Sequence, residues 1–136
     1  MIQRIQSIWL LLASVCAFAG LHFSFYSGSV DQSQSMVFLN GMYNFPISFL
    51  TIAIGTISSV NIFIYKNRKL QIRFCLFTLL LELLLLFLYW TEIKKFNIGT
   101  LSLSSVLQIF VLFFSIMSLL GVYKDKKIVE ESSRLR

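Results

Sequence analysis

Glu82 is the residue of this chain whose type and surroundings raise the question of chemistry most directly. It stands as the one acid in the run LLLELLLLFLYW at residues 79–90. A carboxyl group inside such an apolar segment can carry protons, face an ion path or hydrogen-bond between helices. Catalysis would need a nucleophile, a base or a metal cluster beside it. The role of Glu82 therefore depends on which side chains accompany it.

The other reactive side chains do not form a recognisable site. His22 is the only histidine and cannot assemble a zinc site by itself. Cys16 and Cys75 are not a C-x-x-C pair, and residue counting puts them at different depths, so we expect no disulfide. No phosphate-binding loop, G-x-S-x-G elbow or H-E-x-x-H pair is present in the sequence. We expect no enzymatic activity, no metal and no cofactor.

The composition indicates a chain that lies in a lipid bilayer. Of its 136 residues 57% are hydrophobic and 13% charged, against about 25% charged in soluble domains. Apolar stretches of the length that a spanning helix needs occur at about residues 5–25, 46–65, 74–90 and 101–122. The alternating pattern of a membrane β-barrel is missing. The sequence predicts an all-α integral membrane protein, a four-transmembrane-helix bundle forming a single domain over residues 1–136.

The first apolar stretch also has features of a secretory signal. Arg4 precedes it, and Ala17-Phe18-Ala19 resembles a small-x-small cleavage site. Its apolar length of about 21 residues exceeds the 7–15 residues of a signal core. We therefore interpret it as the first spanning helix.

The positive charges of the chain predict its orientation. Ten of the twelve Lys and Arg residues fall before the first helix, between the second and third, or after the fourth. By the positive-inside rule this places both the N and C termini in the cytoplasm. Within the short turn, contacts with anionic lipid headgroups or an acidic partner are expected for Lys66, Arg68, Lys69 and Arg73. No nucleic-acid partner is needed to explain the net charge of +6.

For two segments outside the helices, the sequence allows more than one structure. Residues 27–44 form the outer loop, in which the apolar run at residues 36–39 is either a strand or a segment lying on the bundle. The charged tail at residues 123–136 is expected to continue the fourth helix or to fold onto the membrane surface.

Each predicted helix carries a seam of small or polar residues at helical spacing. Side chains at steps of three, four and seven share one face. The four seams are Ala13, Ala17, Gly20 and Ser24; Ser48, Thr51, Gly55 and Ser58; Gln71, Cys75, Thr78, Glu82 and Tyr89; and Ser104, Gln108, Ser115 and Ser118. Such seams are typical of helices that associate in lipid through close contact and hydrogen bonds.

Glu82 is accordingly expected to point inward. Residue counting puts Thr56 and Ser115 at its depth without any basic residue, so we expect a neutral carboxyl that donates a hydrogen bond to a hydroxyl or carbonyl group. The predicted polar contacts between helices are made by Glu82, Thr78, Ser115 and Thr56. A proton-coupled site and a contact with a partner subunit are the alternatives for Glu82.

Three stretches resemble a known family: MIQRIQSIWLLLA at the start, KNRKLQIRFC at residues 66–75 and KDKKIVEESSRLR at the end. The chain is similar over its whole length to small four-helix inner-membrane proteins of Bacteroidota, catalogued as a domain of unknown function. It differs from the family's tail at Glu130 and Ser133, where arginine and aspartate are usual. The resemblance implies a bacterial inner membrane location and transfers no catalytic residue.

The function expected from these features is non-enzymatic. We expect an integral, multi-pass membrane protein that serves as an accessory or structural subunit of a larger inner-membrane assembly. Its partners would be the lipid bilayer, anionic lipids on the cytoplasmic face and other membrane protein subunits. The alternative is a small proton-coupled transporter using Glu82, and an enzyme acting on lipid is a third possibility without a visible set of reactive groups.

Overall fold

The computed structural model describes residues 2–29, 36–65, 67–96 and 98–134, with side chains described from Ile5 onward except at 130 and 132–134. Four long helices dominate it: α1 (Ile2–His22), α2 (Phe45–Phe63), α3 (Arg68–Ile93) and α4 (Val106–Arg134). Three short strands and one 3₁₀ turn complete the fold: β1 (Ser24–Ser29), β2 (Val37–Asn40), β3 (Ile98–Leu101) and η1 (Leu103–Ser105).

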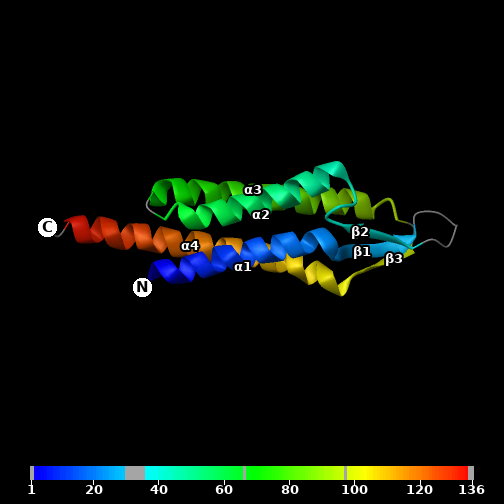
Figure 1. Cartoon of the computed structure of the whole chain (residues 1–136), viewed down its shortest axis with the longest axis horizontal. Coiled ribbons are helices and arrows are strands. Elements are labelled where there is room, and N and C mark those ends of the chain that lie inside the picture. Colours follow the sequence, from blue (N-terminus) through cyan, green and yellow to red (C-terminus); the bar gives the residue numbers. More distant parts are fainter. Residues whose placement is uncertain (1, 30–35, 66, 97, 135–136) are drawn as a thin grey trace.

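The helices form an up-and-down bundle. Each packs against its two neighbours in the order α1, α2, α3, α4 and back to α1. The start of α1, the end of α2, the start of α3 and the end of α4 lie at one end of the molecule (Figure 1). We call this the terminal end, and the opposite end, which carries the strands, the sheet end. Short connections between antiparallel neighbours are what such bundles require.

All four helices are long and apolar enough to cross a membrane. Their large apolar side chains, such as Leu80, Leu83 and Phe87 on α3, are mostly exposed on the outside of the bundle. A helical bundle satisfies its backbone groups internally, which a spanning structure must do. The prediction of four such helices is confirmed.

The strands form a three-stranded antiparallel sheet of order β2-β1-β3 at the sheet end. The prediction of an all-α protein is therefore confirmed for its four helices and wrong at this end; within the predicted outer loop at 27–44, residues 30–35 lie outside the described residues. Of the two alternatives for residues 36–39, the strand is the one observed, as β2. Gly28 pairs directly with Gly99, and a Cβ on Gly28 would lie 2.8 Å from the Gly99 Cα.

The sheet also shifts the predicted helix boundaries. Helix α4 begins at Val106 rather than near 101, because Ile98–Leu101 pairs with β1. Helix α3 covers 68–93 instead of 74–90, since its charged first turn is helical too. Helix α4 continues to Arg134. Of the two alternatives for the charged tail, continuation of the fourth helix is the one observed.

An apolar cluster fastens the sheet to the bundle. It contains Ala17, Leu39, Ile47, Leu50, Ile54, Leu85, Tyr89 and Val111. Leu39 of β2 is fully buried in it, and the ring of Phe25 in β1 stacks on Tyr89 of α3 with centroids 4.4 Å apart. The cluster fills the half of the bundle interior next to the sheet.

Candidate functional site

The predicted polar seams meet inside the bundle. All five residues of the α3 seam, Gln71, Cys75, Thr78, Glu82 and Tyr89, are buried. Buried seam members on α2 and α4 include Thr51, Ser58, Gln108, Ser115 and Ser118. The helical spacing read from the sequence thus identifies the inward faces of the helices, whereas the seam members Ser24 and Ser104 lie in β1 and η1, beyond the helix ends.

Glu82 lies at the centre of this interior with none of its surface exposed. The Nε2 amide group of Gln108 on α4 donates a hydrogen bond to Glu82 Oε1. Gly20 of α1 lies beside Gln108, where a Cβ would make an ordinary contact 3.7 Å from the Gln108 Oε1. Glu82 therefore joins α3 to α4 across the bundle, and its side chain accepts at Oε1 from an amide instead of donating to a hydroxyl or carbonyl group.

The other three predicted contact residues have different outcomes. Thr78 is buried, and its Oγ1 donates to the Phe74 carbonyl of its own helix at 2.8 Å. Ser115 is buried on α4. Thr56 is exposed, and its hydroxyl donates back to Ile52 and Ala53, so the prediction that Thr56 contacts another helix is wrong.

The register of the helices brings Glu82 within one turn of Gln108. Cys75 lies against Ser118 at 3.8 Å, and counting along antiparallel helices places Thr78 level with Ser115 and Glu82 level with Val111. On α2, the residue buried at this depth is Ile54, and Thr56 sits two positions on, at about 200° around the helix. Depth alone suggested Thr56, whereas helical phase excludes it.

A second polar group lies nearer the terminal end. The Nδ2 of Asn61 on α2 donates to Cys75 Sγ at 3.1 Å and to the Gln71 carbonyl at 3.4 Å. Cys75 in turn contacts Ser118 of α4, so this group links three helices. Both Cys16 and Cys75 are free thiols.

Helices α1 and α2 are joined through small residues. The hydroxyl groups of Ser14 and Ser59 lie 2.7 Å apart, and Ser14 Oγ also donates to the Gly55 carbonyl at 3.2 Å. The ring of Phe18 covers Gly55, whose missing Cβ makes this approach possible. Small residues commonly mediate helix contacts of this kind in membranes.

Sequence reasoning overlooked three buried polar residues at the ends of the seams, Gln6, Asn61 and Asp125. Each continues a seam by helical steps: Gln6 through Leu10 to Ala13, Asn61 from Ser58, and Asp125 through Val122 from Ser118. Extending each seam by one or two helical turns along the sequence identifies these three residues.

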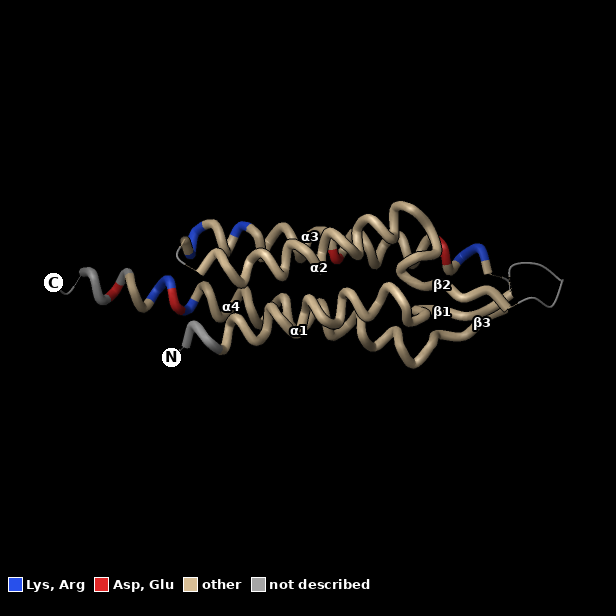
Figure 2. Tube along the Cα trace, viewed as in Figure 1, with Lys and Arg blue, Asp and Glu red and all other residues tan. Residues whose placement is uncertain are grey.

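The basic residues gather at the two ends of the molecule, and the long central parts of the helices are nearly free of them (Figure 2). Of the predicted headgroup contacts, Lys69 and Arg73 are exposed, and Lys66 lies outside the described residues. Arg68 is partly buried and donates from Nη1 to the Asp125 carbonyl at 2.6 Å. Arg68 therefore ties the start of α3 to α4.

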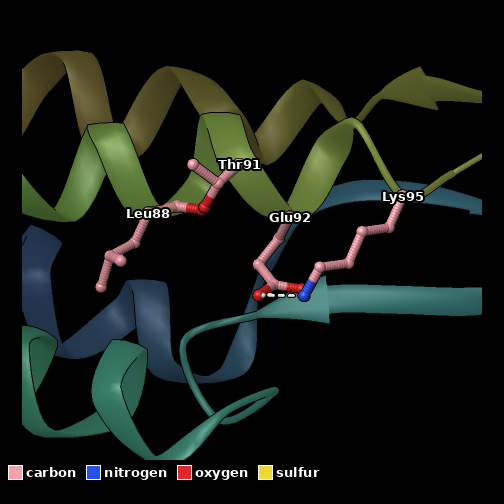
Figure 3. Close-up of polar contacts among 4 residues, drawn as sticks. All are labelled: Leu88, Thr91, Glu92 and Lys95. Atoms are coloured by element: carbon pink, nitrogen blue, oxygen red, sulfur yellow. Dashed lines mark hydrogen bonds and ion pairs between the residues drawn. The ribbon is translucent and has the colours of Figure 1, made fainter.

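The sheet end of α3 holds a local set of polar contacts. Lys95 Nζ forms an ion pair with Glu92 Oε1 at 2.8 Å, and Thr91 Oγ1 donates to the Leu88 carbonyl at 2.8 Å (Figure 3). The ammonium group of Lys94 lies 5.7 Å from the centre of the Trp90 ring. A tryptophan with neighbouring lysines is typical of a helix end at a membrane–water interface.

Within the described part of the chain, no three His, Cys, Asp or Glu side chains come together as a set of metal ligands. What the site offers chemically is the fully buried carboxyl group of Glu82, an amide that donates to it, and a series of hydroxyl and amide groups toward the terminal end, where Asp125 is also buried.

Comparison with known proteins adds a family. No curated protein and no solved structure matches the chain. A family model described as "Domain of unknown function (DUF4293)" matches residues 2–135. Because the match covers nearly the whole sequence, the chain belongs to this family of unknown function.

Proposed function

We propose that this protein is a non-enzymatic integral membrane protein of the bacterial inner membrane that serves as an accessory subunit of a larger assembly. In this proposal the terminal end faces the cytoplasm, because ten of the twelve basic residues occur in the segments at that end. The polar interior holds the four helices of the subunit together, and the outer surface meets lipid and partner subunits.

One observation carries the proposal: α4 extends beyond the ends of the other three helices (Figure 1). This projecting segment, residues 126–131, follows the buried Asp125 and carries charged residues together with the exposed Ile128 and Val129. Its exposed pair Lys127–Glu131, at 4.0 Å, supports the helix by only a few tenths of a kcal/mol. A helix that projects with apolar residues exposed is suited to packing against a partner at the membrane surface.

The proposal is tested by purifying the full chain in mild detergent and measuring which membrane proteins accompany it in a fixed ratio. A partner that is retained by wild type and lost by the double variant Ile128→Ser/Val129→Ser supports the proposal. Met42→Ser is the matched control, because Met42 is an equally exposed apolar residue near the sheet end. A lone protein in every preparation, or equal retention by both variants, contradicts it.

The second candidate is a proton-coupled transporter that uses Glu82. The specific observation in its favour is that Glu82 Oε2 is buried and has no hydrogen-bond partner among the described residues. An enclosed carboxyl oxygen of this kind is available to bind and release a proton.

Glu82→Gln separates the two candidates. Glutamine keeps the shape and an acceptor oxygen for Gln108 but cannot exchange a carboxyl proton. A variant that assembles normally in the membrane while losing proton-driven substrate movement in vesicles supports the transporter. A variant that retains all partner binding, together with no proton-driven substrate movement by the wild-type protein, supports the subunit role.

A further inference from the structure

The bundle interior is divided into two halves of different chemistry. From Glu82 to the sheet end the apolar cluster that includes Ile54, Leu85 and Val111 fills it, and the buried polar side chains there, Thr51 and Gln108, donate to the Ile47 carbonyl and to Glu82. From Glu82 to the terminal end it contains a run of polar side chains contributed by all four helices. These are Gln6, Ser14, Ser58, Asn61, Gln71, Cys75, Thr78, Ser115, Ser118 and Asp125, with Leu10, Ala13 and Val122 between them.

Four buried polar atoms have no hydrogen-bond partner within the described residues: Gln6 Nε2, Ser58 Oγ, Asn61 Oδ1 and Glu82 Oε2. Glu82 stands at the inner limit of the polar half, and the other three lie within it. They include one donor, two acceptors and a hydroxyl group that can do either. Buried polar groups in native proteins are bonded to protein or to ordered water, and a membrane interior offers no other source of partners.

The contacts already described connect these atoms along the bundle. Asn61 reaches Cys75, Cys75 reaches Ser118, and one turn further along α4 Gly121 lies against Gln6, where a Cβ would come within 2.9 Å of the Gln6 Cγ. On α3 the polar positions Gln71, Cys75, Thr78 and Glu82 recur at almost every turn. Polar groups thus extend without a long gap from the terminal end to Glu82.

Toward the sheet end from Glu82 the described residues of the interior offer no comparable run of polar groups. Ile54, Leu85 and Val111 have no exposed surface, and the ring of Tyr89 on α3 stacks on Phe25 of β1, where the bundle meets the sheet. Buried apolar space of this kind stays dry, whereas a polar site with two to four partners holds water.

We propose that ordered water occupies the polar half of the bundle and connects Glu82 with the solution at the terminal end, and that the apolar half seals Glu82 from the sheet end. Water is the ligand that fits, because it donates and accepts and so satisfies all four atoms. Glu82 then exchanges its proton with one side of the membrane only. The inference does not depend on the subunit role, since a hydrated interior is compatible with either candidate function.

Among the described residues, Glu82 is the titratable side chain at the inner end of the polar half. Among the described residues of the packed helices, the interior titratable side chains are Cys75 and Tyr89 on α3 and Asp125 on α4. Helix α1 contributes the half-buried Cys16, and α2 contains no titratable residue. Asp125 is near the terminal end, where Arg68 contacts its carbonyl, so Glu82 is the inner end of the polar path.

Water-edited solid-state NMR of the full chain in lipid bilayers tests this directly. Side-chain carbons of Glu82, Asn61 and Ser58 should receive magnetisation from water, while those of Leu85 and Ile54 should not. The double variant Ser58→Val/Asn61→Leu fills the polar half and should abolish the transfer to Glu82. Thr56→Val on the exposed face of α2 is the matched control and should leave that transfer unchanged.

The outcomes are decisive in both directions. Absence of water transfer to Glu82 and Asn61 in the wild-type protein overturns the proposal, and this holds even if the double variant does not fold. Equal transfer to Leu85 and Glu82 overturns the sealed apolar half. Transfer confined to the polar half and lost in the folded double variant supports the one-sided path.

Discussion

Glu82 and Gln108 are 26 residues apart in the sequence and lie on different helices, yet their side chains bond inside the bundle. In lipid the apolar side chains of two helices gain little by touching each other, so polar contacts and close packing must supply much of the association. A carboxyl group costs free energy when it enters hydrocarbon. The amide of Gln108 recovers part of that cost and does so only in the correct packing of α3 against α4.

Replacing Glu82 should show this dependence on shape and bonding. Glu82→Leu leaves the Gln108 amide without its acceptor, and we expect it to lower the free energy of unfolding by about 1–2 kcal/mol. Glu82→Gln preserves an acceptor and should cost less. Thermal denaturation of both variants in the same detergent measures the difference, and equal stabilities would contradict the assignment.

Two glycines on facing backbones make a sharper steric prediction. A Cβ at Gly41 would lie 2.7 Å from the Gly20 carbonyl oxygen and 2.9 Å from the Leu21 Cα, both backbone atoms that cannot swing away. Gly41→Val should therefore destabilise the protein by about 1–3 kcal/mol, the usual range for overpacking. Gly20→Ala is the control, since its nearest contact at 3.7 Å is ordinary and alanine favours a helix. Similar melting temperatures for the two variants would be inconsistent with this geometry.

For single residues, the sequence predicts which face of a helix points inward better than it predicts which side chains hydrogen-bond to each other. The inward positions of α3, from Gln71 to Tyr89, follow from helical spacing alone. The partner of Glu82 does not, because it depends on the register between α3 and α4, which long-range contacts such as Arg68 with Asp125 fix. The prediction for Thr56 is wrong for the complementary reason. Residue counting gives its depth along the bundle correctly, but its position around α2 faces outward.

At the scale of elements, the charged ends of the helices behave differently from the spans between them. Arg68 reaches from the first turn of α3 to a carbonyl of α4 and bridges the base of the projecting segment. Neighbouring Lys69 is exposed. The contact of Arg68 is therefore specific, although both residues belong to the same basic turn.

Removing this contact should loosen the projecting segment. We expect Arg68→Ala to increase amide hydrogen exchange in residues 126–131, because the end of α4 loses its tie to the bundle. Lys69→Ala should leave exchange there unchanged. Exchange measured by mass spectrometry in detergent or nanodiscs checks both, and identical profiles for the two variants would refute the role of Arg68.

The helices were predictable and the sheet was not. Apolar runs of spanning length and a cluster of basic residues mark the helices without any knowledge of contacts. The strands have only four to six residues, and β3 pairs with a strand some seventy positions earlier in the chain. Their sequences, such as SFYSGS and IGTL, are too short and too rich in small residues for alternation to be visible.

For the molecule as a whole, orientation is the property on which the proposed function depends. If the terminal end faces the cytoplasm, a reporter that is active only outside the cytoplasm should be inactive when fused after the last residue. The same reporter inserted in the loop between β1 and β2 should be active. The reverse pattern would invert the topology and place the projecting end of α4 on the outer side.

The interior organisation is the central claim, and a double-mutant cycle on Glu82 and Gln108 tests it most directly. The cycle compares the free energies of unfolding of wild type, Glu82→Leu, Gln108→Leu and the double variant in lipid or mild detergent. We expect a coupling free energy of about 0.6–2 kcal/mol, because the two single variants break the same hydrogen bond. Effects that simply add would show that these side chains do not hold α3 and α4 together and would contradict the account.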